Sequence, residues 1–206
     1  MKRSTLLTRL TIPVLMIGSF SSPSAQRLTI EVDGGVSQPI GIAMDHWKTG
    51  VDLGANLFLW PVRRIGIGLR FGYDRWIPDR LKFTMGDSLR NPEVKGSTSI
   101  FEIIPSARLA TAYKTNPINF FGQVGTGIYA IRATSHATGP VSGVPSDIQI
   151  DNGTWIGRWG FQIGPGISIA AARHVTIEVF PLYNGILNGD HLFQYFVVNA
   201  GVSLKF

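Results

Sequence analysis

The 206-residue chain contains no cysteine, few charged residues and no long apolar run beyond its N-terminus. Without cysteine it can form neither a disulfide nor a thiolate metal site. No later segment approaches the roughly 18 to 20 continuous apolar residues of a membrane helix. Charged residues make up only 16% of the chain, 24 residues are glycine, and helical periodicity is scarce. These absences are unusual for a soluble enzyme and direct attention to β-structure.

The N-terminus has the features of a secretory signal peptide. Basic residues open it, a mostly apolar stretch covers 10–20, and small residues precede the expected cleavage near Ala25. This order predicts a signal over 1–25 and one mature domain over 26–206. Three of the 19 basic residues lie in the signal, which leaves 16 basic and 13 acidic residues and a net charge of +3. So small a charge predicts no nucleic-acid partner.

Apolar and polar residues alternate with a period of two in eight segments. In "IGIGLRFGYD" (65–74), every odd-numbered residue is apolar, and every even-numbered residue is Gly, Arg or Asp. Successive side chains of a strand point to opposite faces, so each segment predicts a strand with one apolar face. The predicted strands cover 27–36, 50–60, 65–74, 98–113, 118–132, 157–171, 174–185 and 194–206.

The connections between these segments differ in length. The short ones are 61–64, 114–117 and 172–173, the long ones are 37–49, 75–97 and 133–156, and 186–193 is intermediate. Short turns at one rim and long loops at the other predict an all-β fold, an eight-stranded antiparallel up-and-down β-barrel. Transmembrane barrels of the outer-membrane type show this asymmetry.

Glycine and charge on the polar face favour a membrane barrel over a soluble lipocalin-type barrel, which would hold its apolar residues inside. Glycines in a narrow lumen make room for long side chains from opposite strands. The polar-face glycines are Gly54, Gly66, Gly68, Gly72, Gly125, Gly127, Gly160, Gly164, Gly166 and Gly201.

The polar face also carries acidic and basic residues in similar number. Such a mixture suits an enclosed network, because buried charges must be paired. The alternative interpretation is that the polar face is exposed to water and carries scattered charges that form no network. The predicted lumen network comprises Glu31, Asp52, Arg70, Glu102, Arg108, Arg158, Glu178 and Lys205, and Asp33 and Asp74 share its face.

Aromatic residues on the apolar face gather toward the two ends of the predicted strands. Such rings are typical of the girdles at membrane interfaces. Those expected near the long-loop rim are Tyr73, Phe101, Trp159, Phe161, Tyr183 and Phe196, and those near the short-turn rim are Tyr113, Phe120 and Phe206.

The chain ends in "VVNAGVSLKF", with apolar residues at every second position up to Phe206. This ending resembles the C-terminal signal that the barrel-assembly machinery recognises in bacterial outer-membrane proteins. The whole mature chain is similar to the small OmpA-like and OmpX-like outer-membrane β-barrels. The resemblance implies a bacterial outer-membrane location, a monomer surrounded by lipid and lipopolysaccharide, and the assembly machinery as a partner during biogenesis. It also implies that Glu31, Glu102 and Glu178 with Arg70, Arg108 and Arg158 fill the lumen.

The remaining motifs of the sequence do not predict a catalytic or binding site. "GTGIYA" (125–130) matches a dinucleotide-binding pattern, but a strand follows it where that motif needs a helix. The four histidines lack metal-ligand spacing, and the neighbours Ser135 and His136 have no evident third catalytic partner. We therefore predict no catalytic, cofactor-binding or metal-binding residues and no cofactor. The cations of the loop 75–97, from Arg75 to Lys95, could bind lipopolysaccharide phosphates or belong to an ordinary solvated loop.

The leading functional prediction is a non-enzymatic barrel with a structural or surface-interaction role, which presents its long loops to an unknown extracellular ligand. Three alternatives stay open at this point: a lipid A-modifying outer-membrane enzyme, a narrow channel, and a secreted lipocalin-like carrier.

Overall fold

The computed structural model describes residues 27–41, 47–77, 93–111, 117–141, 144–189 and 191–206, so the predicted signal peptide lies outside it. All the pairings between neighbouring strands are antiparallel. Within the described residues, no helix has the length and apolar character needed to span a bilayer. The strands are β1 (Arg27–Ile40), β2 (Gly50–Val62), β3 (Ile65–Trp76), β4 (Glu93–Ala110), β5 (Ile118–Val141), β6 (Val144–Asn152), β7 (Ile156–Ala170), β8 (Val175–Asn188) and β9 (His191–Lys205).

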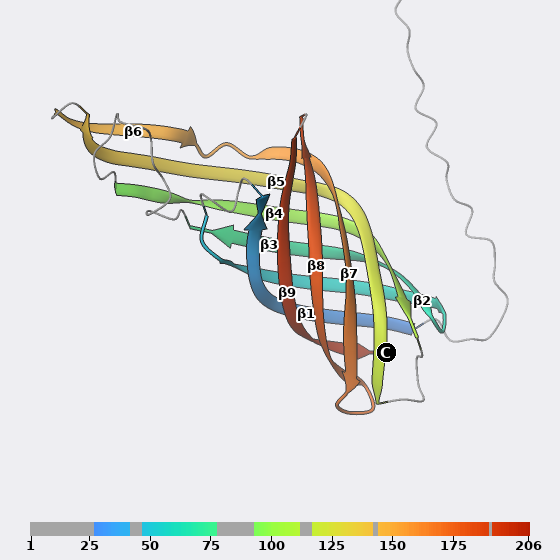
Figure 1. Cartoon of the computed structure of the whole chain (residues 1–206). Coiled ribbons are helices and arrows are strands. Elements are labelled where there is room, and N and C mark those ends of the chain that lie inside the picture. The colour runs from blue at the N-terminus through green and yellow to red at the C-terminus, as the bar shows by residue number, and fades with distance from the viewer. Residues whose placement is uncertain (1–26, 42–46, 78–92, 112–116, 142–143, 190) are drawn as a thin grey trace, which may run out of the picture.

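Eight of these strands close into a barrel (Figure 1). Their order is β4-β3-β2-β1-β9-β8-β7-β5, and pairing between β4 and β5 completes the ring. The closed antiparallel barrel confirms the predicted fold class. Every strand of the ring pairs with a neighbour on both sides, so the eight-stranded ring has no open edge.

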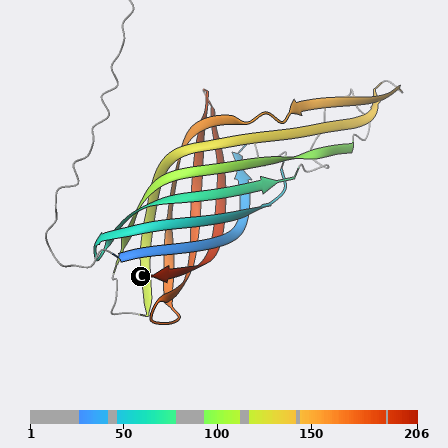
Figure 2. The ribbon, with the colours of Figure 1, turned by 180° about the vertical axis from the view of Figure 1, so that it is seen from behind.

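The two ends of the barrel differ in their connections. Arg27 opens β1 and Phe206 follows β9, so both lie at the same rim as the tight turn at Arg63 and Arg64. We call this end the inner rim. The opposite end, the outer rim, carries a projecting sheet of β4, β5 and β6 (Figures 1 and 2).

The outer connections contain more strand than the alternation predicted. The expected loop 133–156 is largely a hairpin, in which β6 pairs with the outer part of β5. The expected connection 186–193 is mostly strand as well, since β8 runs to Asn188 and β9 starts at His191. Beyond the apolar band both faces of a strand meet water, so the period of two fades while backbone pairing continues. The hydrophobic alternation therefore predicted the part of each strand that has an apolar outer face, and it missed the extension beyond that part.

The barrel is apolar outside and polar inside. Val32 and Ile67 are 64% and 59% exposed, whereas Glu31 and Arg70 are 0% and 1% exposed. A lipocalin-type barrel requires the opposite arrangement, so that alternative is wrong. A closed sheet with an apolar exterior meets the requirement of hydrocarbon that every backbone polar group be paired internally.

Aromatic side chains on the exterior lie at both ends of this apolar surface. Phe101, Trp159 and Phe196 are exposed toward the outer rim, and Phe120 and Phe206 toward the inner rim. Phe161 and Tyr183, also predicted for the outer girdle, are half-buried and pack with ring centres 6.0 Å apart. Tyr73 is half-buried beside Phe101, and Tyr113 lies outside the described residues.

Candidate functional site: the filled lumen

Arg70 holds three carboxylates in the outer half of the lumen. Its Nη1 lies 2.9 Å from Asp33 Oδ2, its Nη2 3.1 Å from Asp52 Oδ1, and its Nε 2.7 Å from Glu102 Oε1. All four side chains are at most 2% exposed. The planar guanidinium can donate in several directions at once, which makes arginine suited to this position. These residues form what we call the Arg70 cluster.

A fourth carboxylate belongs to the same region. Asp74 lies opposite Asp52 in the register between β2 and β3 and is 1% exposed. Among the described residues, neither of its carboxylate oxygens has a hydrogen-bond partner. Tyr195 donates a hydrogen bond of 3.3 Å from its hydroxyl to Glu102 Oε2. The outer half of the lumen therefore contains more acid than base.

Arg108 organises the inner half of the lumen. Its Nη1 lies 2.9 Å from Glu31 Oε2 and 2.6 Å from Glu178 Oε2, and its Nη2 donates to Gln123 Oε1 at 2.8 Å. The guanidinium carbon also lies 4.4 Å and 4.1 Å from the ring centres of Phe58 and Phe121. Aromatic faces attract cations, so the rings contribute to holding the charge. We call Arg108, Glu31, Glu178 and Gln123 the Arg108 cluster.

Asn56 joins the two clusters. Its Nδ2 donates to Glu31 Oε1 at 3.1 Å and to Asp33 Oδ2 at 2.9 Å. β1 supplies both carboxylates, because residues two apart on a strand point to the same face. The two clusters thus form one connected polar network along the barrel axis.

Glycine makes room for the network, as the sequence predicted. A Cβ atom built on Gly54 would lie 2.5 Å from Asp33 Oδ1 and 2.6 Å from both terminal nitrogens of Arg70. Real Cβ atoms essentially never come so close to another heavy atom. On Gly122, which points to the exterior, a Cβ would meet nothing within 4 Å.

Gly54→Ala is expected to lower the free energy of unfolding by about 1–3 kcal/mol, because the added methyl group displaces Arg70 from its carboxylates. Chemical unfolding in detergent micelles, followed by tryptophan fluorescence, measures this. Gly122→Ala is the matched control and should change stability by less than about 0.5 kcal/mol. Equal effects of the two substitutions would contradict this explanation of the lumen glycines.

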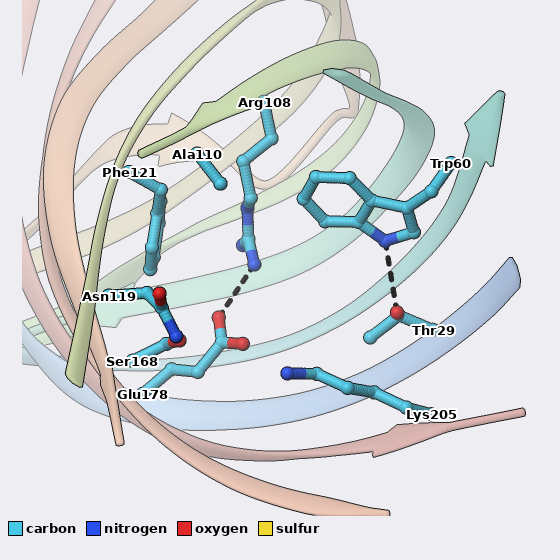
Figure 3. A pocket seen from close by; sticks show the side chains of 9 residues that line it. All are labelled: Thr29, Trp60, Arg108, Ala110, Asn119, Phe121, Ser168, Glu178 and Lys205. Carbon is cyan, nitrogen blue, oxygen red and sulfur yellow. Dashed lines mark hydrogen bonds and ion pairs between the residues drawn. The ribbon is translucent and has the colours of Figure 1, made fainter. Parts of the chain in front are cut away.

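A small cavity opens from the lumen near the inner rim (Figure 3). Its volume of about 20 Å³ has room for about one water molecule. Trp60 borders it and donates a 3.0 Å hydrogen bond to Thr29 Oγ1, and the side chain of Lys205 points toward Glu178 (Figure 3). The lining consists of Thr29, Trp60, Arg108, Ala110, Asn119, Phe121, Ser168, Glu178 and Lys205. A cavity of this size is a packing defect in a filled lumen and not a ligand pocket.

The structure places Arg158 away from both clusters, so the prediction of this residue as a lumen cation is wrong. It is exposed at the outer end of β7, where its Nε donates to Asn188 Oδ1 at 3.1 Å. Its parity matches the inward-facing Gly160 and Gln162, but it lies farther out along the strand. The period of two determines the face of a residue and leaves its height undetermined.

Asp33 is the main residue that the predicted network omitted. It accepts hydrogen bonds from Arg70 and Asn56, and the pattern that placed it on the polar face could have included it. Gln123 and Asn56 were missed because an uncharged amide gives no sequence signal of its role. Among the described residues, no three His, Cys, Asp or Glu side chains group in a way that could hold a metal ion.

A closed barrel of eight strands, apolar outside and charged inside, defines a small β-barrel of the outer-membrane type. Known structures share this fold. Neisserial surface protein A matches with a TM-score of 0.54 and 13% identity, over 87% of this chain and 97% of that one. The Thermus thermophilus major outer membrane protein matches with 0.54 and 10%, over 87% and 99%.

A further match is Ail, the attachment invasion locus protein of Yersinia pestis, solved in complex with the heparin analogue sucrose octasulfate. Its TM-score is 0.51 at 10% identity, over 88% of this chain and 99% of that one. No family model and no curated protein sequence matches the chain. The structural matches confirm the predicted fold, which these three outer-membrane barrels share with the chain.

Proposed function

We propose that this protein is a non-enzymatic integral barrel of the outer membrane that acts through its outer surface, in a structural or interaction role. The observation that carries the proposal is the inverted distribution of polarity, with Arg70 and Arg108 paired inside and the hydrocarbon side chains outside. A lumen filled by its own side chains has no space for a substrate or a stream of solute. The surfaces that remain for an interaction are therefore the exterior of the barrel and its outer rim.

The projecting sheet at the outer rim supports an interaction role. β6 lies at the end of the strand order and pairs only with β5 among the described strands. A strand edge carries unpaired N–H and C=O groups, which can accept a strand from another chain. We propose this edge as the surface for an extracellular partner.

We also propose that the barrel has no catalytic activity. His174 meets the backbone oxygen of Lys205 at 3.0 Å at the inner rim, far from any extracellular substrate. His46 and the side chains of Ser135 and His136 lie outside the described part of the chain. Mass spectrometry of lipid A from cells with the wild-type barrel and with His136→Ala tests the point, and a mass difference between the two would contradict a non-enzymatic role.

Phe206 and the strand before it are proposed to carry the assembly signal. Phe206 is exposed on the exterior, and its backbone N–H donates to Leu28 O at 2.9 Å, beside the seam between β9 and β1. That seam is where the last strand closes the barrel. We propose the assembly machinery as the partner there and a monomer as the final state.

We predict that the protein gives no steady current in planar lipid bilayers, because the two arginine clusters and the ring of Trp60 fill its lumen. The measurement is single-channel recording after insertion of the refolded chain. Insertion itself is checked by gel migration before and after boiling, since a closed membrane barrel survives cold detergent. Reproducible conductance steps from correctly folded protein would favour the channel alternative.

A further inference from the structure

Two arginines and a serine form a row across three strands on the exterior of the barrel. Arg75 of β3 pairs in register with Ser99 of β4, and Ser99 pairs with Arg132 of β5. Neighbouring strands are about 4.8 Å apart, so the Cα atoms of the two arginines are separated by about 10 Å with the serine between them. Arg75 and Arg132 are both exposed residues. Long, flexible arginine side chains can converge over this gap.

The row lies in a polar hollow of the exterior surface. The hollow has a volume of about 280 Å³ and is lined by Tyr73, Arg75, Ser97, Ser99, Arg132 and Thr134. Two internal hydrogen bonds order the lining: the hydroxyl oxygens of Tyr73 and Ser99 are 3.0 Å apart, and Thr134 Oγ1 donates to Ser97 O at 3.3 Å. The lining therefore offers two cations and four hydroxyl groups, and no carboxylate.

The two charges are available to an external anion. Among the described residues, no carboxylate forms an ion pair with Arg75 or Arg132, and the Arg132 guanidinium carbon lies 5.9 Å from the ring centre of Trp155. Elsewhere in the barrel, Arg70 and Arg108 each hold at least two carboxylates. Two forked guanidiniums with hydroxyl donors between them suit an anion with three or four oxygens better than a carboxylate with two.

The height of the hollow identifies the source of that anion. Two residues inward along the same strands, and on the same face, Tyr73 pairs with Phe101. Two residues further in, Phe71 pairs with Ile103. Aromatic residues mark the boundary between hydrocarbon and headgroups, and the apolar band continues from there toward the inner rim. The arginine row thus lies at the level of the headgroups of the outer leaflet.

We propose that Arg75, Ser99 and Arg132 bind the phosphate group of an anionic lipid in the outer leaflet. The inference rests on the proposed function, because it requires the barrel to be embedded in that membrane. Among the residues that line the hollow, the charged ones are the two arginines. Binding is a lateral contact on the wall of the barrel, and the lumen has no part in it.

The test compares lipid retention by three forms of the full barrel. Each is reconstituted in phosphatidylcholine nanodiscs containing bis-phosphorylated lipid A, transferred to detergent, and analysed by native mass spectrometry for co-purified lipid A. We expect R75Q/R132Q to retain about tenfold less lipid A than wild type, as loss of charge-assisted hydrogen bonds implies. R63Q/R64Q removes two exposed arginines from the inner-rim turn and should retain as much as wild type. Dephosphorylated lipid A should be retained equally by all three forms.

Two further arms separate the possible sources and failures. An excess of inorganic phosphate should leave lipid A retention unchanged, and complete displacement by it would overturn the assignment to a lipid. Equal retention by wild type and R75Q/R132Q, or an equal loss in R63Q/R64Q, would overturn the site. The boiling-dependent gel shift shows that each variant is folded. Failure of the wild-type barrel to show that shift would instead contradict the proposed membrane function.

Discussion

Arg70→Met is expected to lower the free energy of unfolding by about 3–5 kcal/mol, or to prevent folding altogether. The substitution keeps an unbranched side chain and removes the cation that pairs with Asp33, Asp52 and Glu102; no other described residue supplies a cation to these carboxylates. An uncompensated buried charge is strongly destabilising, because the desolvation of the carboxylates is no longer offset by attraction. Urea unfolding in detergent micelles, monitored by tryptophan fluorescence, provides the measurement.

Two variants show whether the charge is responsible. Arg64→Met removes an exposed arginine at the inner-rim turn and should stay within about 0.5 kcal/mol of wild type. Adding D33N, D52N and E102Q to Arg70→Met removes the stranded charges and should restore most of the lost stability. If Arg70→Met alone costs less than about 1 kcal/mol, the lumen is not a dry charge-paired network.

Val124→Arg is expected to lower the free energy of unfolding by about 2–4 kcal/mol in a lipid bilayer. Val124 lies midway along the outward-facing positions of β5 between Ile118 and Ala130, pairs in register with Ala107 and Ile163, and is 52% exposed. In a membrane barrel the position of Val124 lies at the centre of the hydrocarbon layer, where burying a guanidinium costs free energy. In a barrel surrounded by water the same substitution would be neutral or favourable, so the sign of the effect reports the solvent.

The matched control places the same charge at a different depth. Leu187 is 55% exposed near the outer end of β8, where Leu187→Arg should cost only about 0–1 kcal/mol. Equilibrium unfolding in phosphatidylcholine vesicles compares the two variants. Equal costs at Val124 and Leu187 would contradict the depth that we assign to the apolar band.

Depth in the membrane and position along the axis are what the strand pattern predicts least well. The segment 65–74 predicted β3 almost completely, since lipid outside and charge inside demand opposite side chains at successive positions. The same alternation assigns Arg158 to the inward-facing side of β7, yet its side chain lies outside the lumen network. Arg70 and Asp33 are 37 residues apart, and the registers of β1 with β2 and of β2 with β3 bring them together.

The pattern of residues was enough to predict the strand segments, their number in the barrel and the polar residues of one face, because a period of two is a local property of an extended chain. The folded barrel was needed to show which charges meet, that Asp33 pairs with Arg70, that β5 continues into a hairpin with β6, and that Arg75 and Arg132 line one exterior hollow. These features depend on the register and closure of paired strands, which backbone hydrogen bonds establish between residues far apart in the chain.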